Sequence, residues 1–299
     1  MRNASLFAPM IDLAPRTEKP RQSGVTMLND RGWSYSFIEG ILDGYAHVID
    51  IAKLTAAHLY QPEHCVARKV ALYKRYGVMT QTGGPILEIA RAQGRADEVL
   101  EYLRRIGFEA IEVSSESVPN RASDADEAKF MRHCRDMGYE LHAEVGKKFP
   151  AGDSARLAPN KLNMDEAVRQ FKFYLDNGAR FVYFEGHVLR AIVGDMGEIT
   201  EGRDQILEMV ERVGLQNIIF EVPATYLDYA GKRALQALLV YLFGPDVNIG
   251  NVLVQEVSEI EQIRGGTFPA FGAPCGDHPW LASIHRHGGV AADGWWQGN

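Results

Sequence analysis

The sequence predicts a single closed (β/α)8 barrel, and three observations lead to that fold. Short apolar segments alternate with amphipathic helical segments along most of the chain, which is typical of a parallel sheet covered by helices. About eight such units, of roughly 30 residues each, fit into one chain of 299 residues. An open doubly wound sheet is the alternative, but it usually has fewer units and often a glycine-rich phosphate loop after its first strand. The first predicted strand is followed by no such loop. We expect an N-terminal arm over residues 1–20, the barrel over 21–265 and a C-terminal extension over 266–299.

Each predicted strand is a short apolar or alternating run bounded by glycine, proline or polar residues. The expected strands cover residues 24–30, 47–53, 77–84, 108–115, 139–148, 179–185, 217–223 and 246–251. Between them, apolar residues recur at helical spacing. The expected helices cover residues 34–45, 62–76, a stretch broken near Gly94 that runs to 106, 124–137, 165–177, 201–213, a long stretch that ends at 243, and 254–264. Pro62 lies in a first helical turn, the position that tolerates proline best.

The predicted strand at residues 139–148 shows how catalytic side chains could be positioned. Side chains alternate along a strand, so His142, Glu144 and, if the extended backbone persists, Lys148 share one side. Leu141, Ala143 and Val145 take the other side and suit packing under a helix. A carboxylate and an ammonium group would then meet where a strand gives way to a loop, which is where parallel α/β folds keep their active sites. A structural ion pair at a strand end is the alternative interpretation.

The composition excludes several classes of function. A net charge of −7 argues against a nucleic acid or an anionic membrane surface as the main partner, although a few local cations would suffice for a small anionic substrate. The three cysteines are widely spaced and form no CxxC pair, which favours reduced thiols over a zinc site or a disulfide framework. No apolar run approaches the ~20 residues of a membrane span. We therefore expect a cytoplasmic protein that interacts with neither nucleic acid nor membrane.

Polar residues recur at the predicted strand ends. They are Lys53, Thr82, Gly83, Gly84, Glu112, Glu144, Lys148, Glu185, Glu221 and Asn251. Glutamates that face one barrel mouth repel one another unless cations neutralise them, and lysines together with a hard divalent ion such as magnesium would do so. Any single one of these residues could instead form a structural ion pair, and Asn251 could be a helix cap. The double glycine could be a tight turn or a backbone that approaches a phosphate or sulfonate.

The C-terminal extension is rich in glycine, proline, histidine and tryptophan. It contains His278, His285, His287, Trp295 and Trp296. A histidine metal site is one interpretation, but the spacing matches no standard ligand pattern. An extension that packs on a neighbour or forms a lid is therefore the favoured interpretation.

Several collinear segments carry a resemblance to a known family. They are residues 19–27 with Asp30, Ile49-Asp-Ile-Ala-Lys53, Thr82-Gly-Gly84, residues 107–114, Glu144-Val-Gly-Lys-Lys148, Phe184-Glu-Gly186, Phe220-Glu-Val-Pro223 and residues 243–251. With these segments the chain resembles the phosphosulfolactate synthase family, which makes a precursor of coenzyme M from phosphoenolpyruvate and sulfite. The resemblance covers residues 19 to about 268, and the order of the segments is more specific than any one of them.

The resemblance implies a (β/α)8 barrel, a magnesium ion, and Lys148 as the proton donor with Glu144 as a second catalytic residue. Sulfite would add to the methylene carbon of phosphoenolpyruvate, the charge on the substrate carboxylate would be stabilised by magnesium, and an ammonium group would protonate the adjacent carbon. The implied metal ligands are Glu112, Glu144 and Glu185. The implied substrate-binding residues are Lys53, Gly83, Gly84, Arg190, Gly250 and Asn251. We expect small anionic substrates and a homo-oligomer.

The chain departs from the family pattern in loops expected to hold the two anions. After Lys53 the family usually reads Phe-Gly-Trp-Gly-Thr-Ser, whereas this chain reads Leu54-Thr-Ala-Ala-His58. After Glu185-Gly186 the family has Arg-Glu-Ser-Gly, whereas this chain has His187-Val-Leu-Arg190, so that Arg190 could replace the missing arginine. The double glycine is followed by Pro85, and Arg-Gly-Asp-Thr has become Arg264-Gly-Gly-Thr267. The alternatives are therefore a related enolate-type addition or elimination on another small phosphorylated acid, and a non-catalytic stress-associated role in the same family.

Overall fold

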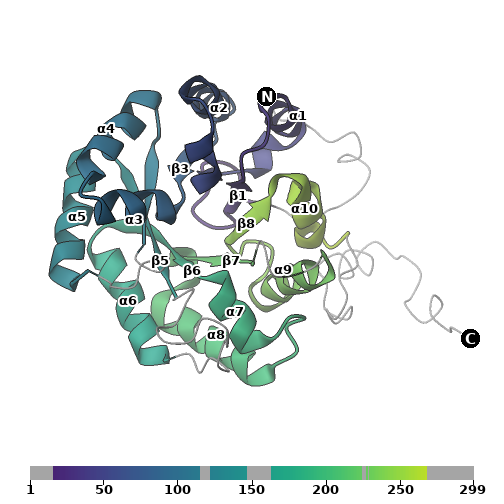
Figure 1. Cartoon of the computed structure of the whole chain (residues 1–299). Coiled ribbons are helices and arrows are strands. Elements are labelled where there is room, and N and C mark those ends of the chain that lie inside the picture. The colour runs from purple at the N-terminus through teal and green to yellow at the C-terminus, as the bar shows by residue number, and fades with distance from the viewer. Residues whose placement is uncertain (1–15, 115–121, 147–162, 224–226, 228, 268–299) are drawn as a thin grey trace, which may run out of the picture.

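The computed structural model is a closed barrel of eight parallel strands with a ring of helices around it (Figure 1). The structure describes residues 16–114, 122–146, 163–223, 227 and 229–267. The strands are β1 (Thr26–Asp30), β2 (Ile51–Leu54), β3 (Met79–Thr82), β4 (Ala110–Val113), β5 (Glu140–Val145), β6 (Ala179–Phe184), β7 (Ile218–Glu221) and β8 (Ile249–Leu253). Each pairs in parallel with the next, and β1 pairs with β8 to close the barrel. The predicted fold is thus confirmed, and the open sheet was the wrong alternative.

Ten α-helices are present in the described part of the chain. They are α1 (Tyr35–Tyr45), α2 (Glu63–Arg75), α3 (Gly84–Ala92), α4 (Ala96–Ile106), α5 (Asp124–Asp136), α6 (Met164–Asp176), α7 (Gly186–Val193), α8 (Thr200–Val213), α9 (Tyr229–Phe243) and α10 (Val257–Gly265). Short 3-10 helices cover η1 (Ala46–Val48), η2 (Ala56–Tyr60), η3 (Leu215–Asn217) and η4 (Val254–Glu256). The break near Gly94 is confirmed, since it separates α3 from α4. Sequence reasoning missed α7, which begins directly after β6 without an intervening loop.

Several helix starts follow from local side-chain chemistry. Ser34, Ser123 and Asn163 each accept a hydrogen bond from a backbone N–H in the first turn of the helix that follows. Such caps satisfy amide groups that have no partner within the helix. Gly107 ends α4 with a φ of 99°, a left-handed conformation that glycine adopts at little cost.

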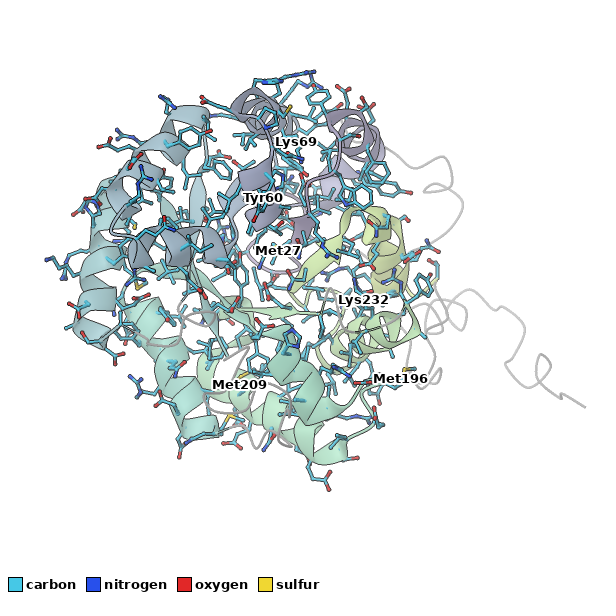
Figure 2. All side chains as sticks on the ribbon, viewed as in Figure 1. Met27, Tyr60, Lys69, Met196, Met209 and Lys232 are labelled. Carbon is cyan, nitrogen blue, oxygen red and sulfur yellow. The ribbon has the colours of Figure 1, made fainter. Side chains whose placement is uncertain are left out.

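The barrel interior is layered along the barrel axis. Its amino-terminal half is apolar and is filled by Val25, Met27, Ile51, Met79, Phe181 and Ile219; Met27 is labelled near the centre of Figure 2. Two residues further along each strand the inward side chains become polar, as when Met27 is followed by Asn29 and Ile51 by Lys53. On β5 the predicted alternation is confirmed, because Leu141, Ala143 and Val145 pack with the outer helices while His142 lies inside. The polar layer of the interior therefore lies nearer the carboxyl ends of the strands than the apolar layer does.

Residues 16–24 pack against the amino-terminal end of the barrel. The Nζ of Lys19 donates to the carbonyls of Ala46, Ile49 and Gly77, and Arg21 forms an ion pair with Asp50 at 3.0 Å. A cavity of about 250 Å³ lies at this end, with Lys19 and Arg21 in its lining. Because both cations are already paired, this cavity is a poor binding site for an anion. The polar layer at the other end of the barrel is the stronger candidate for chemistry.

Among the described helices, none is both long and apolar enough to cross a membrane.

Candidate active site

Three glutamates gather inside the barrel near the carboxyl ends of its strands. Glu112 comes from β4, Glu144 from β5 and Glu221 from β7, and all three are buried. One carboxylate oxygen from each lies within 4.8 Å of those of the other two. The three side chains point inward because each occupies an inward position of its strand. We call Glu112, Glu144 and Glu221 the carboxylate cluster.

Lys53 lies within the carboxylate cluster. Its Nζ lies 3.0 Å from Glu112 Oε2 and in hydrogen-bond contact with Glu221 Oε1, and it lies over the ring of Tyr183 at 4.9 Å from the centroid. Lys53 is only 6% exposed. In this low-dielectric position the ammonium group bridges two carboxylates that would otherwise repel each other.

The carboxylate cluster has the donor chemistry of a site for a hard cation. Its three buried carboxylates converge on one small region, and carboxylate oxygens are ligands that magnesium prefers. The donor set therefore fits magnesium, with Glu112, Glu144 and Glu221 as the residues that could hold it.

Glu112 is held by donors on both oxygens. Its Oε1 accepts from the backbone N–H of Gly84 at 3.0 Å, and its Oε2 accepts from Nε2 of Gln81 at 3.1 Å, in addition to Lys53. A side chain at Gly84 is excluded, because a Cβ there would lie 2.7 Å from Glu112 Oε1 and 2.7 Å from Ser114 Cβ. Glycine thus allows the backbone of α3 to approach the carboxylate closely.

The double glycine forms the turn between β3 and α3, one of the two uses that the sequence suggested. The N–H of Gly83 donates to the carbonyl of Leu54 at 2.9 Å, and the N–H of Gly84 donates to Glu112. Both amides therefore have partners within the protein. The glycines join β3 to α3 and position a carboxylate; their assignment as ligands of the substrate stays a prediction.

Gly250 and Asn251 lie on β8 beside the carboxylate cluster. A Cβ at Gly250 would lie 2.8 Å from Met27 Cε and 3.0 Å from Ile219 Cγ2, so the glycine leaves room for the apolar side chains below the cluster. Asn251 has a φ of 55°, a conformation that asparagine tolerates better than most residues and that often marks functional sites. Its Oδ1 accepts from Nδ2 of Asn29 at 2.9 Å. The assignment of Gly250 and Asn251 to substrate binding stays a prediction.

Two other predicted residues have partners outside the carboxylate cluster. Oε1 of Glu185 accepts from the backbone N–H of His187 at 3.1 Å and caps α7, and Glu185 is not part of the cluster defined above. Arg190 forms two hydrogen bonds with Asp195, at 2.5 Å and 3.1 Å. This ion pair raises the pKa of Arg190 and lowers that of Asp195, chiefly through the hydrogen bonds. The assignments of Glu185 to the metal and Arg190 to an anion stay predictions.

Lys148, the predicted proton donor, lies outside the described residues, as do Lys147 and the histidines of the C-terminal extension. β5 carries Glu144 toward the barrel axis, and the chain is described as far as Gly146, whose φ is 122°. β5 ends at Val145, so strand parity does not extend to Lys148, whose role as proton donor stays a prediction from the resemblance.

Sequence reasoning named Glu221 as a strand-end residue but left it out of the predicted metal ligands. One signal could have identified it, since Glu221 follows three apolar residues at the end of its strand, much as Glu112 follows Ala110 and Ile111. No local signal identifies Gln81 or Asn29. Gln81 contacts Glu112, which lies 31 positions away in the chain, and Asn29 contacts Asn251, which lies 222 positions away.

A second set of buried polar residues links the first two strand–helix loops at the same end of the barrel. Asp30, at the end of β1, accepts from Lys69 at 2.9 Å and from Tyr73 at 3.1 Å, and Nζ of Lys69 lies 2.8 Å from Nε2 of His58. Lys69 is labelled between α1 and α2 in Figure 2. His58 belongs to η2, the loop in which this chain departs from the family pattern, and its Nδ1 lies 3.0 Å from the carbonyl of Thr55. The loop after Lys53 is thus fixed to β1 by buried contacts.

Comparison with known families gives one match over nearly the whole described chain. The model described as (2R)-phospho-3-sulfolactate synthase (ComA) matches residues 14–268. This span includes every described strand and helix together with the carboxylate cluster.

Individual proteins agree with that match. A phosphosulfolactate synthase from Methanothermobacter thermautotrophicus is 30% identical over 258 residues, which cover 84% of this chain and 92% of the relative. A protein of the same name from Methanocaldococcus jannaschii is 29% identical over 251 residues, which cover 82% and 92% respectively. Among solved structures, the chitinase ChiC from Aspergillus fumigatus superposes with a TM-score of 0.51 at 10% identity, over 88% of this chain and 98% of that chain. At that identity the likeness concerns the fold alone.

Proposed function

The chain belongs to the phosphosulfolactate synthase family, and we propose that it catalyses the addition of sulfite to phosphoenolpyruvate, assisted by magnesium, to give phosphosulfolactate. One observation carries the proposal. The carboxylate cluster and Lys53 are buried together at the carboxyl end of a barrel whose family match spans all of them. This is the end at which (β/α)8 enzymes keep their active sites.

The proposed reaction adds sulfite and a proton across the double bond of phosphoenolpyruvate. The sulfur lone pair forms a bond to the methylene carbon, and the electron pair of the C=C bond moves toward the substrate carboxylate. A proton then goes to the carbon that carries the phosphate ester. No group leaves, so the phosphate stays on the product.

Magnesium, when held by Glu112, Glu144 and Glu221, would stabilise the negative charge that gathers on the substrate carboxylate. The chain itself contributes positive charge and a proton. Lys53 holds two carboxylates in place and adds positive charge to a site that must bind two anions. Lys148 is the proposed proton donor, on the resemblance alone. Glu144, on β5, is proposed both to bind metal and to act as a second catalytic residue.

The direct experiment is to incubate the purified protein with phosphoenolpyruvate, magnesium and sulfite and to follow the products by mass spectrometry. We expect a phosphorylated sulfonate that is absent without sulfite, without magnesium, and in the Glu144→Gln variant. Phosphoenolpyruvate that stays intact in the presence of folded, magnesium-loaded protein and excess sulfite would show that the proposal is wrong.

A second candidate keeps the phosphorylated acid and changes the nucleophile. It is favoured by the loop after Lys53, which forms η2 and is fixed by His58, and by Arg190, which is paired with Asp195. A panel of nucleophiles offered with phosphoenolpyruvate separates the two candidates, because only the second allows turnover that is faster with a nucleophile other than sulfite. A non-catalytic role is disfavoured, since a binding protein has no need for so costly a buried charge cluster.

A further inference from the structure

A polar triad lies inside the barrel against the carboxylate cluster. It consists of Gln81 on β3, His142 on β5 and Tyr183 on β6, and each side chain is 0% exposed. Tyr183 Oη lies 2.6 Å from Gln81 Oε1 and 2.9 Å from His142 Nδ1. His142 Nδ1 is also in close contact with Gln81 Oε1. Two side chains from neighbouring strands therefore converge on one amide oxygen.

The direction of these hydrogen bonds follows from what each group can do. The pKa of Tyr183 lies well above its usual value, because burial and the charge of Glu112 disfavour the phenolate, so the hydroxyl keeps its hydrogen and donates to Gln81. His142 Nε2 lies 3.0 Å from Oε1 of Glu140. The Glu140 carboxylate is also held by Arg180 and can only accept. Nε2 of His142 therefore donates to Glu140, and Nδ1 lies against Gln81 Oε1 and Tyr183 Oη.

The amide of Gln81 is oriented by its contacts at both ends. Its nitrogen donates to Glu112 Oε2 at 3.1 Å, and a carboxylate can only accept. Its oxygen therefore faces the ring of His142 and the hydroxyl of Tyr183, which donates to it at 2.6 Å. The reversed amide would turn its oxygen toward the Glu112 carboxylate and would lose the hydrogen bonds to Glu112 and from Tyr183, so it is disfavoured.

We propose that His142 and Tyr183 are positioning residues that act through Gln81 to hold Glu112 in the geometry that binds a divalent cation. This inference rests on the proposed function, because it assigns a purpose to the magnesium site. Residues that support metal ligands from behind commonly change metal affinity by 10- to 100-fold when they are replaced, as an order of magnitude.

The competing explanation is simple packing. The ring of His142 lies 5.6 Å from that of Phe181 and 5.7 Å from that of Tyr183, so its loss would disturb the core in any case. The two explanations differ in how substitutions combine. A residue that acts through Gln81 has no further effect on metal affinity once Gln81 is gone, whereas independent packing effects add.

The experiment is a double-mutant cycle with Gln81→Met, His142→Leu and the double variant, read out as Mn²⁺ affinity by electron paramagnetic resonance of the full-length protein. We expect each single variant to weaken Mn²⁺ binding by about 10-fold and the double variant to bind no more weakly than Gln81→Met. Phe181→Leu is the matched control, since it disturbs the packing around His142 without removing a hydrogen bond of the triad, and it should leave the affinity unchanged. Additive losses, or an equal loss in Phe181→Leu, would overturn the inference.

A metal-independent measurement separates this inference from the proposed function. The side-chain NH2 resonances of Gln81, observed by NMR in ¹⁵N-glutamine-labelled protein, should shift in Tyr183→Phe, a variant that keeps the ring and removes one donor. If wild-type protein binds no Mn²⁺, the proposed magnesium site fails while the amide resonances still decide the positioning role. Unchanged Gln81 resonances in both Tyr183→Phe and His142→Leu would overturn the inference even if the metal site is real.

Discussion

Replacing Lys53 by Met tests the charge balance of the candidate active site. The ammonium group is 6% exposed and bridges Glu112, at 3.0 Å, and Glu221. Methionine keeps a chain of similar length against the ring of Tyr183 and removes only the charge and its hydrogen bonds. Removing one partner of a buried ion pair costs about 3–5 kcal/mol, because the other charge stays buried without compensation. We therefore expect Lys53→Met to lower the free energy of unfolding by about 3–5 kcal/mol in the presence of a chelator.

The measurement is urea unfolding of wild-type protein and variant, each with chelator and with millimolar magnesium. A ligand that binds only the folded state stabilises it by an amount that grows with its affinity. The variant has lost the cation that shares these carboxylates, so magnesium should bind it more tightly and restore more of its stability than it adds to the wild type.

Lys69→Met is the matched control. Lys69 is also buried, at 2% exposed, and pairs with Asp30 at 2.9 Å, but Asp30 is not part of the carboxylate cluster. The control should lose a similar free energy of unfolding, and magnesium should stabilise it no more than it stabilises the wild type. A Lys53→Met protein as stable as wild type in chelator, or an equal response of both variants to magnesium, would refute the reasoning.

Three further predictions follow from single positions. Gly84→Ala should destabilise the protein by about 1–3 kcal/mol, measured by urea unfolding, because the new methyl group meets two side-chain atoms at 2.7 Å; Gly83→Ala, whose nearest neighbouring atom would lie at 3.4 Å, should be close to neutral. Lys148→Met should lower turnover by about 10²-fold or more in steady-state assays, while Lys147→Met, the matched control, should be tolerated. Burial raises the pKa of Asp30, but its imidazole and ammonium partners outweigh burial and lower it below the unfolded-state value of about 3.9. Its contribution to stability is therefore complete above that value and is lost as the pH falls through the folded-state pKa, so Asp30→Asn should flatten the acid side of stability measured against pH.

The barrel could be predicted because its pattern is local and repeated. In β5, for example, period-two alternation separates Leu141, Ala143 and Val145 from His142 and Glu144, and the structure places the two sets on opposite sides of the sheet. Strand parity and closure then bring distant glutamates to one mouth. The existence of a carboxylate cluster could thus be predicted from the sequence.

Which glutamates belong to the carboxylate cluster could not be predicted from the sequence, because this depends on where each strand ends. Strand parity gives Glu185 an inward position after Tyr183, but β6 ends at Phe184 and the Glu185 side chain turns to cap α7. Glu221 is still within β7 and keeps its inward position. A difference of one residue in strand length decides which carboxylate joins the cluster. The short connection also explains why α7 was missed, since the residue that follows the last residue of β6 already caps the helix.

The groups that contact the double glycine could not be predicted from the sequence either. A glycine pair indicates that something approaches the backbone closely, but the approaching group could equally belong to a substrate or to the protein. Here it is Glu112, 28 residues further along the chain. The polar triad could not be predicted for the same reason, since its members contact one another across β3, β5 and β6.

The two halves of the proposed reaction depend on different parts of the barrel. The carboxylate cluster and Lys53 lie on strands, whose positions are fixed by barrel register, so the half that stabilises charge on the phosphorylated acid is constrained by the fold itself. Two of the departures from the family pattern lie after β2 and after β6, in η2 and α7, whose sequences are not fixed by the register of the strands. Loops change specificity while a scaffold is kept. We therefore expect magnesium-dependent binding of phosphoenolpyruvate to be retained whichever nucleophile reacts, and isothermal titration with phosphoenolpyruvate in the absence of sulfite is the measurement that checks it.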